Sequence, residues 1–198
     1  MAYEIPQWIW DERPYDMQDH RFVLPQMLNK VLGDPLIGAE IGTAYGSMVI
    51  ALLAKFPLLH MYAIDPFVPY DPKDSMSMPQ KRMDEVYEFT RNRLLGTRAE
   101  LIRNTSINTA ATFKDYSLDF AFIDAVHQYE PCCADIRAWW PKIRNGGLLT
   151  GHDYCTYWNG VQKAVNEFAV EMKLPLLVWN DIEEPPIRHA TIWAIQKP

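Results

Sequence analysis

The chain has 198 residues, of which 48% are hydrophobic, and this is the size of one globular domain that buries a core without disulfides. We therefore expect a single domain over residues 1–198. The formal net charge is −6, from 19 Lys and Arg against 25 Asp and Glu, and no basic run is visible. A nucleic-acid partner is not expected, because binding to phosphates needs a positive surface.

The cysteines and the apolar runs bear on the cellular setting. Cys132, Cys133 and Cys155 are odd in number and fit neither a disulfide framework nor a CxxC metal site. A reducing, cytoplasmic setting is therefore expected. The sequence shows no signal-peptide pattern and no run of 18 apolar residues, so we expect neither secretion nor a membrane partner.

The N-terminal part combines an irregular arm with a predicted helix, together residues 1–33. The arm carries Trp8, Trp10 and Tyr15 among acids and prolines, and such aromatic side chains must pack on something. They can cover the core, lie over a ligand cleft or close a homodimer. From Arg21 to Leu32 the apolar residues follow the helical period, and a glycine then marks the end of the helix.

Strands and helices alternate over the rest of the chain. Apolar runs predict strands at 36–42, 58–65, 99–104, 118–125, 148–154, 174–181 and 190–197. Helical spacing predicts helices at 47–56, 81–95, 107–113, 131–143 and 158–172, with a turn at Gly146-Gly147. This alternation indicates an α/β fold with a doubly wound, mostly parallel sheet and helices on both faces. The last two strands have no helical pattern between them, so they are expected to pair antiparallel.

Residues 67–80 form a long segment rich in proline, acids and serine between a strand and a helix. A loop of this length often belongs to a substrate pocket or lid, although an ordinary surface loop explains it nearly as well. If the loop lines a pocket, its aromatic and methionine side chains favour an acceptor with apolar surface.

A glycine turn and an acid after it point to a nucleoside. Gly42 and Gly46 let the backbone approach a ligand, and Asp65 follows Gly46 by 19 residues. At this spacing a carboxylate on the second strand accepts hydrogen bonds from ribose hydroxyls. Glycine turns also occur for packing reasons, but the acid at the right distance favours a nucleoside site. Tyr45 is too bulky for a turn that cradles a pyrophosphate, which argues against a dinucleotide.

The segment Glu40-Ile41-Gly42-Thr43-Ala44-Tyr45-Gly46 resembles the first motif, E-x-G-x-x-x-G, of class I S-adenosylmethionine-dependent methyltransferases. The stretches DFAFIDAVHQYE and DIRAWWPKIRNGGLLTGHDY are similar to the small-molecule O-methyltransferase branch of the methyltransferase 24 type. The resemblance extends from about Leu36 to the C terminus. It implies a Rossmann-like sheet of seven strands whose last strand is antiparallel, and S-adenosylmethionine as cofactor.

The resemblance also implies which residues bind the cofactor. Gly42 and its neighbours are expected beside the methionine part, Asp65 at the ribose, Ser106 and Ile107 at the adenine, and Asp124 near the methionine amine or a metal. The expected cofactor-binding residues are Glu40, Gly42, Thr43, Tyr45, Gly46, Asp65, Pro66, Ser106, Ile107 and Asp124. Ser106 has an alternative explanation, as the cap of the short helix that follows.

Two acids, Asp124 and Asp153, follow strands that are expected to be neighbours. Adjacent strands lie about 4.8 Å apart, so both carboxylates can reach one divalent cation. Such an ion removes their repulsion and lowers the pKa of a bound hydroxyl. Oxygen ligands favour Mg²⁺, and a histidine ligand favours Mn²⁺. Related O-methyltransferases bind a metal at these strand ends, but here His152 precedes Asp153 and the usual third acid is not obvious.

Without a metal, His127 is the candidate general base, with His152 and Asp124 as the other candidate catalytic residues. Both histidines have ordinary structural explanations as well. The expected function is methyl transfer from S-adenosylmethionine to a small-molecule hydroxyl, with N-methylation left open. The alternatives are a catalytically silent protein, a hydroxylase on the same fold and a nucleotide-dependent oxidoreductase.

Overall fold

The computed structural model describes residues 20–70, 77–179 and 192–198. In chain order the elements are α2 (His20–Leu32), β1 (Ile37–Ile41), α3 (Ser47–Lys55), β2 (His60–Ile64), α4 (Gln80–Leu94), β3 (Ala99–Ile102), α5 (Ser106–Ala110), β4 (Leu118–Ile123), α6 (Tyr129–Trp139), the 3₁₀ turn η1 (Trp140–Lys142), β5 (Ile143–Gly151), α7 (Asn159–Met172), β6 (Leu176–Trp179) and β7 (Ile192–Gln196). The predictions for the N-terminal arm lie outside the described residues. Among the helices that are described, none is both long and apolar enough to cross a membrane.

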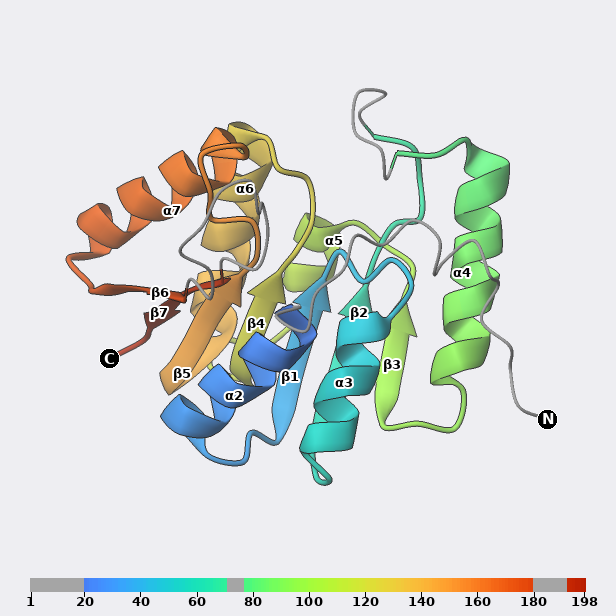
Figure 1. Cartoon of the computed structure of the whole chain (residues 1–198), viewed down its shortest axis with the longest axis horizontal. Helices are drawn as coiled ribbons and strands as arrows, with labels where there is room; N and C mark the ends of the chain where they lie inside the picture. The colour runs from blue at the N-terminus through green and yellow to red at the C-terminus, as the bar shows by residue number, and fades with distance from the viewer. Residues whose placement is uncertain (1–19, 71–76, 180–191) are drawn as a thin grey trace.

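The strands form one sheet in the order β3-β2-β1-β4-β5-β7-β6 (Figure 1). Strands β1 to β5 pair in parallel, and β7 runs antiparallel to both β5 and β6. The predicted Rossmann-like, mostly parallel seven-stranded sheet with an antiparallel C-terminal strand is therefore confirmed. The chain order reverses between β1 and β4, and in such sheets ligands bind at the carboxyl ends of the strands at this point.

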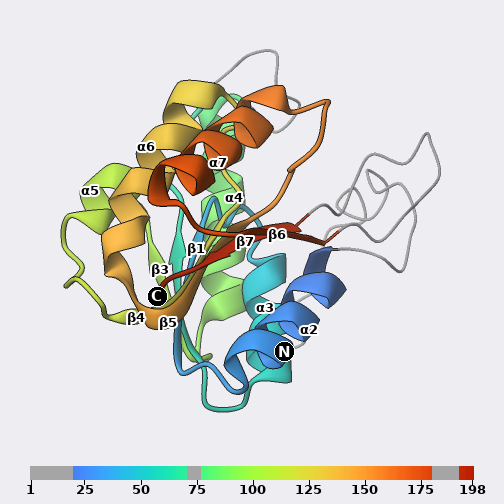
Figure 2. The same cartoon turned by 90° about the vertical axis from the view of Figure 1, so that its left-hand side faces the viewer.

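Helices cover both faces of the sheet (Figure 2). Along β4, Phe120 and Phe122 belong to the core shared with α2 and α3, while Ala121 and Ile123 belong to the core shared with α6 and α7. Successive side chains of a strand point to opposite faces, so a strand buried on both faces is apolar throughout. This explains why the central strands are uninterrupted apolar runs in the sequence.

The predicted turn at Gly146-Gly147 is wrong, because both glycines lie inside β5, which begins at Ile143. The register between β4 and β5 shifts at this point. Gly146 has φ +76°, and a Cβ atom on Gly147 would lie 2.6 Å from the carbonyl oxygen of Asp119. The two glycines therefore permit an irregular, closely packed stretch of strand and do not end it.

Helix α6 also differs from its predicted bounds of 131–143. It begins at Tyr129 and ends at Trp139, and η1 follows it. Pro131 lies in the first turn, where its missing N–H group removes no intrahelical hydrogen bond. The earlier start matters because it brings the beginning of α6 close to the carboxyl end of β4.

Candidate active site

The turn between β1 and α3 forms the floor of the site. Gly42 has φ +92°, and a Cβ atom there would lie 2.0 Å from the carbonyl oxygen of Asp124, so only glycine fits. The Glu40 side chain is 2% exposed and accepts a hydrogen bond from the Thr43 hydroxyl at 3.0 Å. Burial, and next the nearby Asp124 carboxylate, raise the pKa of Glu40 well above its usual value. Glu40 and Thr43 thus support the turn from within the protein.

Asp65 follows β2 and is held by backbone groups. Its Oδ2 accepts a hydrogen bond from the Ala44 N–H at 2.9 Å, and its Oδ1 accepts one from the Phe67 N–H at 2.7 Å. Burial raises the pKa of Asp65, and these two hydrogen bonds offset part of that rise. The carboxylate therefore joins the glycine turn to the start of the long loop in a fixed orientation.

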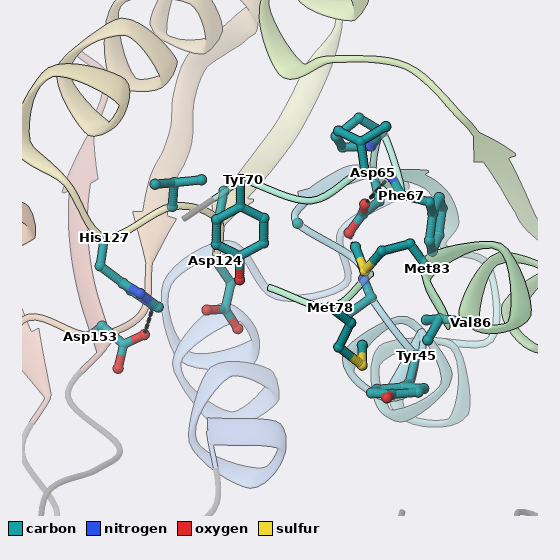
Figure 3. A pocket seen from close by; sticks show the side chains of 16 residues that line it. Tyr45, Asp65, Phe67, Tyr70, Met78, Met83, Val86, Asp124, His127 and Asp153 are labelled. Atoms are coloured by element: carbon teal, nitrogen blue, oxygen red, sulfur yellow. Dashed lines mark hydrogen bonds and ion pairs between the residues drawn. The ribbon is translucent and has the colours of Figure 1, made fainter. Parts of the chain in front are cut away.

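A cavity of about 320 Å³ opens beside these residues, at the carboxyl ends of β1, β2 and β4. His127, Asp124 and Asp153 lie toward one end, and an apolar group toward the other (Figure 3). The apolar group comprises Tyr45, Phe67, Met78, Met83 and Val86. The predicted substrate loop contributes to this lining through Phe67, Val68, Tyr70 and Met78, while its residues 71–76 lie outside the described part.

His127 is oriented by two contacts. Its Nε2 lies 2.8 Å from Asp153 Oδ2, and its ring stacks on Trp158 with a centroid separation of 4.0 Å and an interplanar angle of 20°. Asp153 has φ +58°, a left-handed conformation that is uncommon outside glycine. The turn after β5 thus directs the Asp153 carboxylate back toward the loop that carries His127.

His152 contacts Asp124 and Asp153 from the side away from the main cavity. Its Nδ1 is 3.2 Å from Asp153 Oδ2 and 3.6 Å from Asp124 Oδ1. Burial by itself lowers the pKa of His152, but the two carboxylates outweigh it and raise the pKa to about 10. Burial in turn raises the pKa of Asp153, but hydrogen bonds with His127 and His152 outweigh it and hold this pKa well below its usual range. His152 lines a small inner cavity of about 10 Å³ and does not line the main cavity.

These three side chains can present ligand atoms to one ion. One atom each from Asp124, His152 and Asp153 lies within 4.8 Å of the other two. Two carboxylates and an imidazole suit Mn²⁺ better than Mg²⁺, which prefers oxygen ligands. The donor set fits a divalent ion once His152 has lost its proton, because only the neutral ring coordinates a metal.

A second cavity, of about 220 Å³, adjoins the first. The two share Gly42, Pro66, Ala125 and Val126 in their walls. A ligand whose ribose lies at Asp65 can therefore extend past these residues into the second cavity. Ser106 and Ile107, the residues expected at the adenine, line this second cavity.

The alternative explanation of Ser106 as a helix cap is wrong. The cap of α5 is Thr105, whose hydroxyl accepts a hydrogen bond from the Asn108 N–H at 3.4 Å. The Ser106 hydroxyl instead accepts a hydrogen bond from Trp139 Nε1 at 2.9 Å. Ser106 is thus tied to α6, on the opposite side of the second cavity.

Residues 39–154 match the model of a family described as a methyltransferase domain. The chain belongs to this methyltransferase family. An uncharacterised protein of Acanthamoeba polyphaga mimivirus is 23% identical over 161 residues, which cover 78% of this chain and 68% of that protein.

Solved structures share the fold of this methyltransferase at low identity. A candidate caffeoyl-CoA O-methyltransferase of Staphylococcus aureus has 12% identity and a TM-score of 0.66, over 96% of this chain and 88% of that one. A Podospora anserina methyltransferase bound to S-adenosylhomocysteine has 14% identity and a TM-score of 0.61, over 97% and 85%. An rRNA methylase of Streptococcus thermophilus has 15% identity and a TM-score of 0.64, over 92% and 99%. The fold is that of class I S-adenosylmethionine-dependent methyltransferases.

The methyltransferase fold brings most of the expected site residues to the two cavities, but not all of them. Those that line a cavity are Gly42, Tyr45, Asp65, Pro66, Asp124, His127 and Asp153 in the main one, and Ser106 and Ile107 in the second. Glu40, Thr43, Gly46 and His152 line neither of these two cavities. We therefore assign them no direct contact with the cofactor or the acceptor.

Asp135 and Trp158 were not among the site residues predicted from the sequence. Asp135 lies in α6 and lines the second cavity. It shares the buried face of α6 with Cys132, Ile136 and Trp139, at helical spacing. An acid within an otherwise apolar helix face was therefore a visible signal. Trp158 carried no such signal, because its contact with His127 depends on how two separate loops meet.

Proposed function

We propose that this methyltransferase transfers the methyl group of S-adenosylmethionine to a hydroxyl oxygen of a small molecule. The observation that carries the proposal is that Asp65 and the His127–Asp153 pair border the same cavity from different sides (Figure 3). One cavity therefore offers both a nucleoside-binding carboxylate and a proton acceptor. A hydroxyl group that lies between them can approach the sulfonium methyl group directly.

The cofactor is held mainly by the ends of β1 and β2. In this proposal the ribose hydroxyls donate hydrogen bonds to Asp65, whose orientation the Ala44 and Phe67 N–H groups fix. The methionine part lies along the turn at Gly42, where a side chain would block the approach to the backbone of Asp124. The base extends into the second cavity, since the two cavities share walls.

The chemical step is a direct displacement. The acceptor oxygen forms a bond to the methyl carbon, the bond between that carbon and sulfur breaks, and the hydroxyl proton passes to His127. Because His127 Nε2 donates to Asp153, Nδ1 is the nitrogen that takes up the proton in the neutral ring. Asp153 stabilises the imidazolium that results. General-base assistance of this kind contributes roughly 10²–10⁴-fold to the rate.

A divalent ion is compatible with the same residues. Asp124, His152 and Asp153 would hold it, and a bound ion would supply polarisation of the acceptor hydroxyl. His127 would still orient the acceptor and accept its proton. Activity with and without a chelator distinguishes a metal-assisted from a metal-free reaction.

The character of the main cavity supports a small acceptor with apolar surface. Its volume of about 320 Å³ is at the lower end of the usual range for ligand pockets, roughly 300–1,000 Å³, and in this proposal the ribose and methionine of the cofactor occupy part of it, which leaves room only for a small acceptor. Phe67, Met78, Met83 and Val86 provide apolar contacts. The net charge of −6 does not favour a nucleic-acid acceptor.

The test is transfer of labelled methyl groups from S-adenosylmethionine to a panel of small phenols, aliphatic alcohols and amines, with Mn²⁺, Mg²⁺ or chelator. We expect label on oxygen of an apolar acceptor, strong loss in His127→Ala, and unchanged transfer in Glu130→Gln, a change at an exposed position of α6. Label on nitrogen alone would overturn O-methylation. No transfer to any acceptor, by a protein that binds S-adenosylhomocysteine, would overturn the proposed activity.

A further inference from the structure

Ala44 and Phe67, the two residues that hold Asp65, share an uncommon backbone conformation. Their N–H groups donate to Asp65 Oδ2 at 2.9 Å and to Asp65 Oδ1 at 2.7 Å. Ala44 has φ +44° and Phe67 has φ +50°, so both lie in the left-handed region that residues with a side chain rarely adopt. Such a conformation persists only where the surrounding structure holds it. Further contacts must therefore hold these two residues in place.

One helix supplies a hydrogen bond to each of them. Helix α4 lies beside β3 at one edge of the sheet (Figure 1). Thr90 Oγ1 donates to the carbonyl oxygen of Ala44 at 2.6 Å, and Gln80 Nε2 donates to the carbonyl oxygen of Phe67 at 3.0 Å. The N–H and C=O groups of a residue belong to the planar peptide groups on either side of its Cα atom, so fixing both restricts φ and ψ together. Asp65 and α4 thus hold each turn from its two sides.

The two α4 side chains differ in their surroundings. Thr90 is fully buried, where water does not replace a lost hydrogen-bond partner. One turn later, Arg93 Nη1 donates to the carbonyl oxygen of Tyr45 at 2.9 Å and to Ser47 Oγ at 3.1 Å. The end of α4 therefore holds the glycine turn at successive carbonyl groups, those of Ala44 and Tyr45.

Gln80, at the start of α4, belongs to a connected set of contacts around Phe67. Its amide also donates to Asp84 Oδ1 at 3.0 Å, and Asp84 forms an ion pair with Arg103. The Arg103 guanidinium lies 4.6 Å from the centroid of the Tyr87 ring. Tyr87 in turn packs edge-on against Phe67, with 5.2 Å between the ring centroids. Phe67 is thus held both at its carbonyl oxygen and at its ring.

We propose that Thr90 and Gln80 are positioning residues for the cofactor. They hold Ala44 and Phe67 in the conformation in which both N–H groups point at Asp65, and in this way they set the orientation of its carboxylate toward the ribose. The inference rests on the proposed function, because it takes Asp65 as the ribose acceptor. Thr90 and Gln80 line neither of the two cavities, so their effect on binding passes through the backbone of the residues that they hold.

The first test is calorimetric titration of Thr90 variants of the full chain with S-adenosylhomocysteine. Thr90→Val removes the hydroxyl at nearly constant volume and should lower the affinity about 3–10-fold, the effect of one lost hydrogen bond. Thr90→Ser keeps the hydroxyl and should stay within about twofold of the wild type. The matched control is Thr150→Val, because Thr150 is also fully buried and its Oγ1 also donates to a backbone carbonyl at 2.6 Å, that of Trp193. Both valine variants should unfold at a lower temperature, but only Thr90→Val should bind more weakly.

The second test uses Gln80, whose exposed position makes a folding defect the lesser concern. Gln80→Met removes the donor and should also lower the affinity about 3–10-fold, whereas Lys81→Met, at the neighbouring exposed position, should not. A double-mutant cycle then shows whether the effect passes through Asp65. In the Asp65→Ala background, Thr90→Val should change the remaining affinity by less than about twofold.

The outcomes separate the inference from the proposed function. Wild-type affinity in both Thr90→Val and Gln80→Met overturns the inference. Equal weakening in Thr90→Val and Thr150→Val also overturns it, because any lost buried hydrogen bond would then have the same effect. An undiminished effect of Thr90→Val in the Asp65→Ala background overturns the route through Asp65. In each of these cases the wild-type protein still binds S-adenosylhomocysteine, whereas no binding by the folded wild-type protein overturns the proposed function and the inference together.

Discussion

Asp65 and Asp153 both follow sheet strands and are largely shielded from solvent, yet their surroundings shift their pKa values in opposite directions. Asp65 accepts hydrogen bonds from the neutral N–H groups of Ala44 and Phe67, and burial, the larger effect, raises its pKa. Burial also raises the pKa of Asp153, but contacts with two imidazoles outweigh it and lower this pKa. Backbone donors orient a carboxylate, whereas imidazolium partners also balance its charge.

This difference assigns different tasks to the two sides of the cavity. A carboxylate fixed by the backbone suits binding, because its geometry does not depend on the protonation of a neighbour. A carboxylate paired with imidazoles suits proton transfer, because charge can move within the group. We therefore expect substitutions on the Asp65 side to lower affinity for the cofactor, and substitutions on the Asp153 side to lower the rate.

The largest expected effect is on catalysis, in His127→Ala. Removal of the proposed general base should lower kcat by about 10²–10⁴-fold. The affinity for S-adenosylhomocysteine should change little, because His127 lies on the side of the cavity away from Asp65. Steady-state kinetics and calorimetry on the same preparation measure the two effects. A variant that keeps its full kcat would remove His127 from the mechanism.

Asp65→Ala should show the reverse pattern. Loss of charged hydrogen bonds to the ribose should weaken binding of S-adenosylhomocysteine by at least about 100-fold, at roughly 1.5–3 kcal/mol for each bond. The melting temperature of the unliganded protein should fall modestly, because the Ala44 and Phe67 N–H groups lose their acceptor while the cost of burying the Asp65 charge is removed. Unchanged affinity would contradict the placement of the ribose at Asp65.

Asp153→Asn should destabilise the protein at neutral pH. The pKa of Asp153 is lowered in the folded state, so its ionised carboxylate stabilises the folded protein at any pH above its ordinary pKa. This stabilisation is lost only as the pH falls through the lower pKa that Asp153 has in the folded protein. The substitution should therefore lower the free energy of unfolding by about 1–3 kcal/mol at pH 7. Denaturant unfolding of the two proteins at pH 7 measures the difference. Equal stability would show that the imidazole contacts are weak.

The smallest expected effect has the opposite sign and concerns Asp135→Asn. The pKa of Asp135 is raised to about 6, so its contribution to stability is complete below its ordinary pKa near 4 and is lost as the pH rises through 6. At pH 8 the unliganded variant should be more stable than the wild type by about 1–2 kcal/mol, since about two pKa units correspond to at most about 3 kcal/mol. The advantage should disappear near pH 4. Thermal unfolding across this range measures it, and a constant difference would contradict the pKa shift.

The sequence predicted the Asp65 side of the site better than the Asp153 side, and the reason is physical. Gly42 and Asp65 belong to one strand, turn and strand unit, so their relation follows from local spacing. His127, His152 and Asp153 come from two loops, and Asp153 itself has a left-handed backbone conformation. No periodic pattern reports that backbone conformation, so the sequence could not separate the two histidines.

The fold could be predicted almost completely because its signal is the alternation of apolar strands and amphipathic helices. The misplaced turn at Gly146-Gly147 shows where this fails, since a glycine pair marks a turn and a bulged strand equally well. Asp135 could be recognised in the sequence as an acid on an otherwise apolar helix face. The cavity that it lines, however, is formed by α5 and α6 together with two strand ends. A cavity formed by several segments cannot be inferred from any one of them.

The most direct test of the central claim is calorimetric titration of the purified protein with S-adenosylhomocysteine, with Mn²⁺, with Mg²⁺ and with chelator. We expect one site per chain with micromolar affinity in the presence of chelator, and an additional metal-dependent heat if Asp124, His152 and Asp153 bind an ion. No binding under any of these conditions, by a protein that is folded, would contradict the assignment of the two cavities to S-adenosylmethionine.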